Sequence, residues 1–159
     1  MTAIAAIRVR GTTLARQDVI DTLKMLRLTR ANHCVILPMN PSVKGMLVKV
    51  QHYVTWGEVS PQVIAKLLLK RGRLAGRRAL TDAYVKGNSK FSSVWDFAQA
   101  VAKGESKMQD VEGLTPVLRL NPPRKGYRSV KTSFVSGGDL GDRGVEIEKL
   151  IERMVGGDK

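Results

Sequence analysis

The sequence contains little of what builds covalent cross-links, metal clusters or membrane spans. Among its 159 residues there is one cysteine, Cys34, which excludes a disulfide framework and a cysteine metal cluster and fits a reducing cytoplasm. No apolar run approaches the roughly 18 residues that a transmembrane helix needs. Residues 1–13 are apolar only briefly before they become basic, which is the reverse of a secretory signal. We therefore expect a cytoplasmic protein that does not enter the membrane.

Acidic residues are also scarce. The chain has 14 Asp and Glu against 27 Lys and Arg, which gives a formal net charge of +13 and an isoelectric point near 10.3. A charge so far from neutral favours polyanionic partners such as nucleic acid, acidic lipid or an acidic protein. The 43% of apolar residues is enough for a folded core, so global disorder is not expected.

The acids are unevenly placed along the chain. Glu58 is the only one between Asp21 and Asp82, and none occurs from residue 113 to residue 138. The bases in these two windows are Lys24, Arg27, Arg30, Lys44, Lys49, Lys66, Lys70, Arg71, Arg73, Arg77 and Arg78, and then Arg119, Arg124, Lys125, Arg128 and Lys131. Two basic zones separated by segments of mixed charge indicate a directed binding surface. The alternative is a generally basic, solvated surface.

Hydrophobic periodicity predicts a compact alternating unit in the first 58 residues. β-branched or alternating apolar runs predict strands, and apolar residues at helical spacing predict helices. The predicted elements are a strand over 3–10, a helix over 15–28, a strand over 33–38, a helix starting at Pro41 with Asn40 or Ser42 as its cap, and a strand over 53–56. The order is β-α-β-α-β, and we assign 1–58 to one core domain.

Residues 59–159 read as a mostly helical extension with basic loops, packed on the core. Helix-start and helix-stop residues, such as Ser60, Pro61 and Gly72 around the first helix, mark its elements. The predicted elements are helices over 60–72, 92–105 and 145–155, a short helical turn after the basic loop at 73–78, a strand over 115–120, and a flexible glycine-rich connector over 136–144. The fold class expected for the whole chain is α+β.

No residue pattern supports catalysis. His33 and Cys34 are adjacent on a predicted strand, so their side chains point to opposite faces and cannot form a base and nucleophile pair. Cys34 is expected to be a small buried hydrophobe. The carboxylates lie mostly beside Lys or Arg on helices, and there is neither a Walker-type loop nor a GxGxxG motif. We expect no catalytic residues, no metal, no cofactor and no small-molecule substrate.

Two basic loops carry the strongest binding signal. In "LKRGRLAGRR" (69–78) arginines are spread around glycines, and arginine is suited to bidentate phosphate contacts and to stacking on bases. In "NPPRKGYRSVK" (121–131) the two prolines favour an extended segment that projects four bases. Tyr127 could stack on a base or ribose, or pack on the protein's own surface. The alternative for this second loop is a disordered basic segment that folds on its partner.

Four separated segments carry a resemblance to a known family. They read "TLKMLRLTRANHCVILP", "NPSVKGMLVKVQHYVTWGE", "LLLKRGRLAGRRALTDAYV" and "PVLRLNPPRKGYRSVKTSFVSGGDLGDRG". Together they resemble the large-subunit ribosomal protein thirty family in its archaeal form, the counterpart of eukaryotic large-subunit protein seven. The last two segments look like the extension that the archaeal and eukaryotic forms have and the short bacterial form lacks.

The resemblance implies a ferredoxin-like core with both helices on one face of a small sheet. It also implies a structural, non-catalytic role in the cytoplasmic ribosome. The implied partners are the large-subunit ribosomal RNA near the 5S RNA and the central protuberance, and neighbouring large-subunit ribosomal proteins. A free-standing basic RNA-binding protein or RNA chaperone outside the ribosome is the alternative.

The predicted RNA contacts fall into three groups, on the core, on the first basic loop and on the second. They are Arg30, Asn32, Lys44 and Lys49; Arg71, Arg73, Arg77 and Arg78; and Arg124, Lys125, Gly126, Tyr127, Arg128 and Lys131. We expect phosphate and shape contacts to dominate, so that binding weakens steeply with salt.

Overall fold

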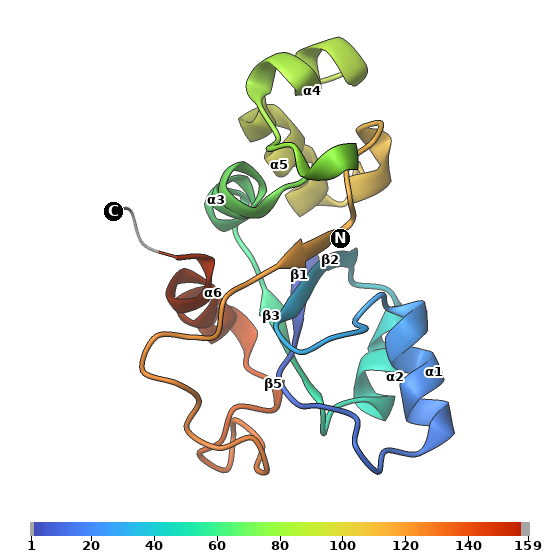
Figure 1. The fold of residues 1–159 in the computed structure, drawn as a ribbon, viewed down its shortest axis with the longest axis vertical. Coiled ribbons are helices and arrows are strands. Elements are labelled where there is room, and N and C mark those ends of the chain that lie inside the picture. Colours follow the sequence, from blue (N-terminus) through green and yellow to red (C-terminus); the bar gives the residue numbers. More distant parts are fainter. Residues whose placement is uncertain (1, 157–159) are drawn as a thin grey trace.

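A five-stranded mixed sheet organises the chain, and helices cover both of its faces (Figure 1). The computed structural model describes residues 2–156. The strands are β1 (Ala3–Arg8), β2 (His33–Pro38), β3 (Val54–Glu58), β4 (Val117–Arg119) and β5 (Gly141–Asp142), in the spatial order β4-β2-β1-β3-β5. The helices are α1 (Gln17–Met25), α2 (Pro41–Lys49), α3 (Pro61–Arg71), α4 (Asp82–Asn88), α5 (Val94–Lys103) and α6 (Ile147–Val155), with short 3-10 turns at Ala75–Arg77, Met108–Asp110 and Gly144–Glu146.

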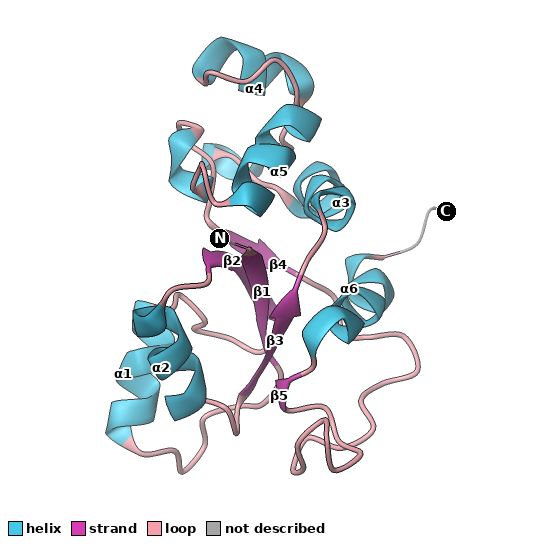
Figure 2. Cartoon of the chain, turned by 180° about the vertical axis from the view of Figure 1, so that it is seen from behind, coloured by secondary structure: helices cyan, strands magenta, loops and turns pink. Residues whose placement is uncertain are grey.

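Helices α1 and α2 lie together on one face of the sheet (Figure 2). Leu23 of α1, Leu26 directly after it and Leu47 of α2 pack there against alternate residues of the central strand β1, Ile4 and Ala6. Strands β1, β2 and β3 pair as antiparallel neighbours. The predicted β-α-β-α-β order and the placement of both helices on one face are therefore confirmed.

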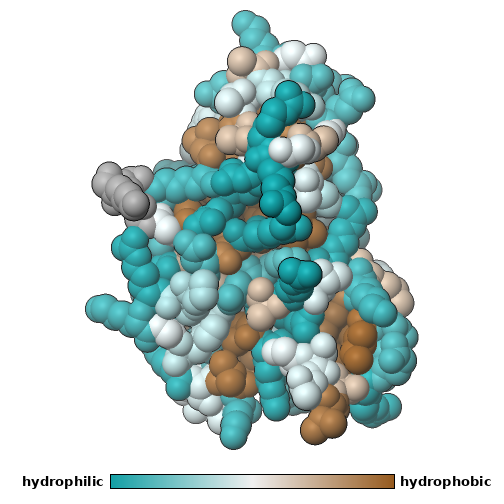
Figure 3. Space-filling model, in the orientation of Figure 1, coloured by the Kyte–Doolittle hydropathy of each residue, from teal (hydrophilic) through white to brown (hydrophobic). Residues whose placement is uncertain are grey.

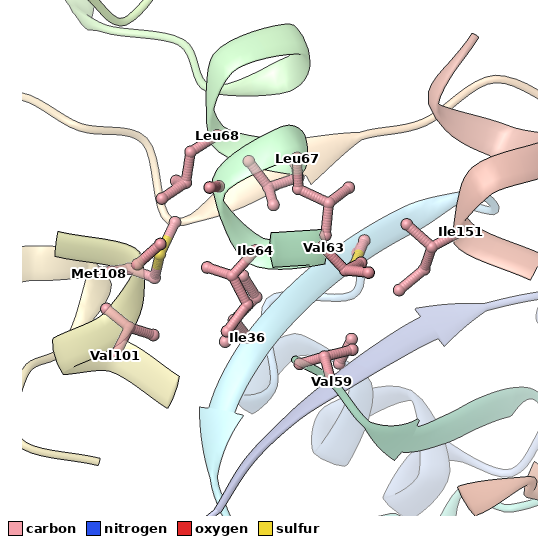
Figure 4. Packing of buried hydrophobic residues seen from close by; sticks show 14 of the residues in the cluster. Ile36, Val59, Val63, Ile64, Leu67, Leu68, Val101, Met108 and Ile151 are labelled. Carbon is pink, nitrogen blue, oxygen red and sulfur yellow. The ribbon is translucent and has the colours of Figure 1, made fainter. Parts of the chain in front are cut away.

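The opposite face of the sheet is covered by α3, α5 and α6, all from the extension. Figure 4 shows Ile64 of α3 above Ile36 of β2, and Val63 of α3 above Val59. Ile151 of α6 reaches the same cluster. Because both faces of the sheet are buried, strand β1 is apolar over five consecutive residues instead of strictly alternating.

The extension also supplies the two outer strands of the sheet. Strand β4 pairs antiparallel with β2, and β5 pairs parallel with β3. The strand predicted over 115–120 is thus present, shortened to three residues. Its position at the edge of the core sheet was not predicted, since pairing over some 80 residues leaves no local pattern. Core and extension share one sheet, and the boundary after residue 58 stays a prediction.

The prediction of a flexible connector over 136–144 is wrong. Arg143 and Asp139 are both buried, and a guanidinium Nη2 of Arg143 lies 2.6 Å from Asp139 Oδ1. Arg143 Nε donates to the hydroxyl of Thr55 in β3 at 3.0 Å, and its guanidinium lies 4.8 Å from the centre of the Phe134 ring. A buried charge needs such partners to offset its lost hydration, so the glycine-rich segment is an ordered turn held by one ion pair.

Helix caps follow the prediction only in part. Ser93 accepts a hydrogen bond from the backbone N–H of Asp96, as expected for the start of α5. Asn40 and Ser60 occupy the predicted N-cap positions but make no side-chain cap bond. Instead, the backbone N–H of Ser60 donates to Glu148 of α6 at 2.6 Å, which ties α3 to the last helix.

Within residues 2–156, no helix is both long and apolar enough to cross a bilayer.

Candidate nucleic-acid interface

The second basic loop, residues 121–131, is called the arm below. Its first residues cap the C-terminal end of α6. The last carbonyls of a helix have no partner within the helix. Here the backbone N–H of Asn121 donates to Met154 O at 3.0 Å, and that of Arg124 donates to Arg153 O at 3.1 Å. The guanidinium of Arg153 donates in return to the carbonyls of Arg124 and Gly126, at 3.2 Å each. The arm is therefore fixed through its backbone, which leaves its basic side chains free to face outward.

A tight turn forms the tip of this arm. Lys125 and Gly126 both have positive φ, 65° and 70°, and the N–H of Gly126 donates to Pro123 O at 3.0 Å. Glycine adopts this conformation without a steric cost. The side chains of Arg124 and Lys125 are exposed. The turn presents these two predicted phosphate contacts at a defined position.

Tyr127 joins the arm to the core. Its hydroxyl donates to Oδ1 of Asn32 at 3.0 Å, and its half-buried ring packs against the core cluster beneath α3 and α6. Burial raises the pKa of this hydroxyl to about 12. Two predicted RNA-binding residues, 95 positions apart in sequence, are thus brought into direct contact. Of the two roles considered for Tyr127, packing on the protein's own surface is the one the geometry supports.

Replacing Tyr127 with phenylalanine is expected to lower the free energy of unfolding by about 0.5–1.5 kcal/mol at pH 7, because Asn32 loses its donor. The neutral hydroxyl is the stabilising form. Its contribution is therefore complete below pH 10.0 and is lost as the pH rises toward the folded-state pKa of about 12. Urea unfolding at pH 7 and pH 11.5 measures both effects.

The matched control is Tyr53→Phe, since the Tyr53 hydroxyl has no hydrogen-bond partner within the described part of the chain. It should leave stability unchanged at pH 7. A Tyr127→Phe variant as stable as the wild type at pH 7 would contradict the anchoring role.

The remaining bases of the arm lie beyond Tyr127. The backbone N–H of Arg128 donates to the buried Asp139, and its exposed guanidinium lies 6.0 Å from the centre of the Phe134 ring. Lys131 is exposed. The ion pair of Asp139 with Arg143 therefore orders this end of the arm as well. Both ends are held without a nucleic acid, which argues against the disordered alternative.

The first basic loop lies beside the segment that leads into β4. Its residue Leu74 forms a bridge with Leu114, and the N–H of Thr115 donates to Arg73 O at 2.9 Å. Arg71, at the end of α3, donates from Nε and Nη2 to the carbonyl of Val155, at 2.9 and 2.7 Å. This predicted RNA contact thus caps α6 as the arm does. Arg77 and Arg78 are exposed beyond it.

A depression of about 290 Å³ lies between this loop and β4. Figure 3 shows strongly hydrophilic side chains over a hydrophobic band at the level where β4 and the loop lie in Figure 1. The residues that line it are Arg71, Arg73, Leu74, Arg77, Thr115, Val117 and Arg119. Arg119 was not among the predicted contacts. The sequence could have identified it, because Arg119 is a base between two leucines, Leu118 and Leu120, in a stretch without acids.

Positive charge continues from this depression across the sheet edge. Arg119 of β4 is directly opposite His33 of β2. The pKa of His33 is lowered, first by burial and then by the charges of Arg119, Arg30 and Arg8. Arg30 is exposed in the loop before β2. Arg30, whose carbonyl accepts from the N–H of His33 at 3.3 Å, and Arg119 therefore both lie beside His33.

Lys44 and Lys49 do not belong to this group. They lie on α2, which sits on the opposite side of the molecule from the arm in both ribbon views (Figures 1 and 2). Lys49 Nζ is 3.9 Å from Asp18 of α1, an exposed pair of little energetic weight. Any RNA contact by these lysines would be a separate one.

Cys34 has the environment of a structural residue. It is fully buried, and burial raises the pKa of its thiol to about 12. The thiolate, which is the nucleophilic form, is therefore negligible at neutral pH.

Within residues 2–156, no group of three or more His, Cys, Asp or Glu side chains is arranged to hold a metal ion.

Comparison with known proteins decides the family. The family model described as "Ribosomal protein L30p/L7e" matches residues 4–54. A protein of Methanoregula boonei named "Large ribosomal subunit protein uL30" is 51% identical over 151 residues, which cover 94% of this chain and 98% of the relative. The chain belongs to the uL30 family. The protein of that name from Methanosphaera stadtmanae is 49% identical, over 95% of this chain and 99% of its own length.

These uL30 relatives extend well beyond the matched core. The family model ends at the start of β3, whereas the alignments with the two archaeal proteins include the extension. The expected resemblance to the archaeal form is therefore confirmed. Large-subunit ribosomal proteins of this family are structural and not enzymes, in agreement with the absence of a catalytic pattern in the sequence.

Proposed function

We propose that this chain binds large-subunit ribosomal RNA, near the 5S RNA and the central protuberance, and holds it through phosphate and shape contacts. Neighbouring ribosomal proteins are its other partners, and the cytoplasmic ribosome is its location. The names of its relatives support a location in the large ribosomal subunit. The placement near the 5S RNA is what the family resemblance implies.

One observation carries the proposed RNA contact. The second basic loop binds C-terminal carbonyls of α6 through backbone N–H groups, and the first binds one through the side chain of Arg71. Most of the other bases of both loops remain exposed. Cations carried on a backbone that is already fixed cost less conformational entropy when they meet phosphates, because no loop has to be ordered. The exposed bases of this proposed interface are Arg30, Arg77, Arg78, Arg119, Arg124, Lys125, Arg128 and Lys131.

A salt titration tests the electrostatic part of this function. The logarithm of the binding constant for the large-subunit ribosomal RNA should fall linearly with the logarithm of salt concentration. With six to eight phosphates neutralised, the slope should be about −4 to −7. Filter binding from 50 to 500 mM salt measures it, and a slope near zero would contradict the proposal.

Sedimentation separates the ribosomal function from the alternative of a free-standing RNA chaperone. Tagged protein in a cell extract should migrate with the large subunit through a sucrose gradient. A protein found only in the unbound fractions would favour the chaperone. Cross-linking from the exposed Lys125, followed by identification of the RNA, tests the placement near the 5S RNA.

A further inference from the structure

The depression between the first basic loop and β4 has the size and lining of a site for one small group. Its volume of about 290 Å³ is at the lower end of the range of about 300–1,000 Å³ typical of ligand pockets. A double helix cannot enter such a space. A single nucleotide can, if its base is not paired.

The lining combines two kinds of chemistry. The half-buried Val117 and the edge of the nearly buried Leu74 contribute apolar surface. Arg73, Arg77 and Arg119 contribute guanidinium groups. A guanidinium plane stacks on a base and also donates two parallel hydrogen bonds to a phosphate. A surface that binds only the RNA backbone needs only the hydrogen bonds to phosphate. The apolar lining is the feature that a phosphate contact leaves unexplained.

Two of the four arginines, Arg71 and Arg73, are held in place before any ligand arrives. Arg71 is fixed by its two hydrogen bonds to Val155 O, and Nη1 of Arg73 donates to Gly72 O at 2.9 Å. No carboxylate lines the depression, and within residues 2–156 neither Arg77 nor Arg119 forms an ion pair. Their charges are therefore available to an anionic ligand.

Two further observations describe the surroundings of the depression. Strand β4 is the edge strand of the sheet, so the outer side of its backbone has no strand partner along residues 117–119. Arg119 is also directly opposite His33 of β2, so its positive charge lies at the edge of the sheet. Burial first, and then this charge, lowers the pKa of His33.

We propose that this depression binds one unpaired nucleotide of RNA, with the base against Leu74 and Val117 and the phosphate between the arginines. The proposal rests on the RNA-binding function proposed above and adds one stacked base to its phosphate contacts. A nucleotide that is already unpaired in the free RNA meets the site best, because the cost of unstacking it is smallest.

Filling the depression without changing its charge tests this site. Thr115 lines it, is exposed, and contributes its backbone N–H to the contact with Arg73. Thr115→Trp keeps that backbone bond and should weaken binding to the large-subunit ribosomal RNA about tenfold or more, the value of one lost base stack. The salt slope should stay unchanged, since no cation is removed.

Two controls keep the result interpretable. Thr115→Ser should bind as the wild type does, and Thr13→Trp adds the same bulk on the exposed loop between β1 and α1. Melting temperatures of all three variants identify any failure to fold. If Thr115→Trp does not fold, Thr115→Gln, which is smaller and uncharged, replaces it in the same assay.

Chemical probing of the bases gives the second readout. In the wild-type complex one unpaired base should be protected, and the same base should become reactive in the Thr115→Trp complex. Equal affinities, or protections confined to the sugar-phosphate backbone of paired RNA, would overturn the proposed nucleotide site and leave the RNA-binding function intact. If the wild-type protein itself fails to bind RNA, both proposals fall together.

Discussion

Replacing Asp139 with asparagine is expected to lower the free energy of unfolding by roughly 3–5 kcal/mol, the typical cost of breaking a buried ion pair. The carboxylate accepts hydrogen bonds from Nη2 of Arg143 and from the backbone N–H of Arg128. An amide places an N–H₂ group against one of these donors and leaves the guanidinium of Arg143 buried without a counter-charge. Urea unfolding at pH 7 measures the change.

A loss of this size is a large part of the roughly 5–15 kcal/mol that stabilises an ordinary domain. It should also loosen both neighbours of the pair, the glycine-rich turn at 136–144 and the distal end of the arm. Hydrogen exchange at the N–H groups of Arg128 and Asp139, which are bonded to Asp139 and to Ser129 O, reports that loosening directly.

The matched control is Asp142→Asn, an exposed position three residues away. Its Oδ1 accepts from the N–H of Gly144 at 2.9 Å, and an asparagine oxygen can accept the same bond. The cost should stay within about 0.5 kcal/mol. A double-mutant cycle with Arg143→Met isolates the coupling of the pair. An Asp139→Asn protein as stable as the Asp142→Asn protein would refute the stabilising role.

Changing Arg124, Lys125 and Arg128 together to alanine is expected to weaken binding to the large-subunit ribosomal RNA about 100-fold at 0.1 M salt. The slope of the logarithm of the binding constant against that of salt should become shallower by about 2–3, since each phosphate contact contributes about 0.7–0.9. The fold should survive, because the arm is held by its backbone and by Tyr127. Lys125 and alanine both carry a Cβ, so its positive φ adds no new strain.

Three exposed lysines on α4, on α5 and between them provide the matched control, Lys86, Lys90 and Lys103. Their triple alanine variant removes the same formal charge from a region outside the proposed interface. It should retain most of the affinity and the full salt slope of the arm contacts. If the two triple variants lose affinity equally, net charge alone would explain binding. A large fall in the melting temperature of the arm variant would show that its side chains support the fold.

Local patterns predicted the core well. The continuous apolar run of β2 reflects burial on both faces of the sheet, and the apolar stripe of α1 reflects burial on one face of the helix. Sequence patterns report both directly. The ends of the elements were less accurate. The helix predicted over 15–28 is observed over Gln17–Met25, because Leu26 and Leu28 are buried in a turn after the helix and not on it.

The glycine-rich segment was misread for a physical reason. Glycines at 137, 138, 141 and 144 predict flexibility when their neighbours are taken as solvated. Asp139 and Arg143 lie between them, and only the tertiary fold places the hydroxyl of Thr55 and the ring of Phe134 around that pair. Three of these glycines, at 137, 141 and 144, have positive φ, and the fourth, Gly138, allows a close approach of the backbone. A Cβ on Gly138 would lie 2.1 Å from the carbonyl oxygen of Thr132.

The candidate interface was predicted by residue type but not by arrangement. Counting charges along the chain identified both basic loops, because a stretch with few or no acids can be read directly from the sequence. It could not separate cations that face outward from those that bind the protein itself. Arg71 caps α6, Asn32 and Tyr127 bind each other, and Arg119 joins the first loop at the sheet edge.

By itself, the sequence determined the order of the core elements, the strong positive charge and its two zones, and the absence of a catalytic pattern. These depend on composition and on periods of two to four residues. Only the tertiary structure decided that β4 and β5 complete the sheet, that the arm is anchored at both ends, and that a depression of about 290 Å³ lies beside Arg119. Each of those depends on contacts between residues tens of positions apart, and such contacts exist only once the chain has folded.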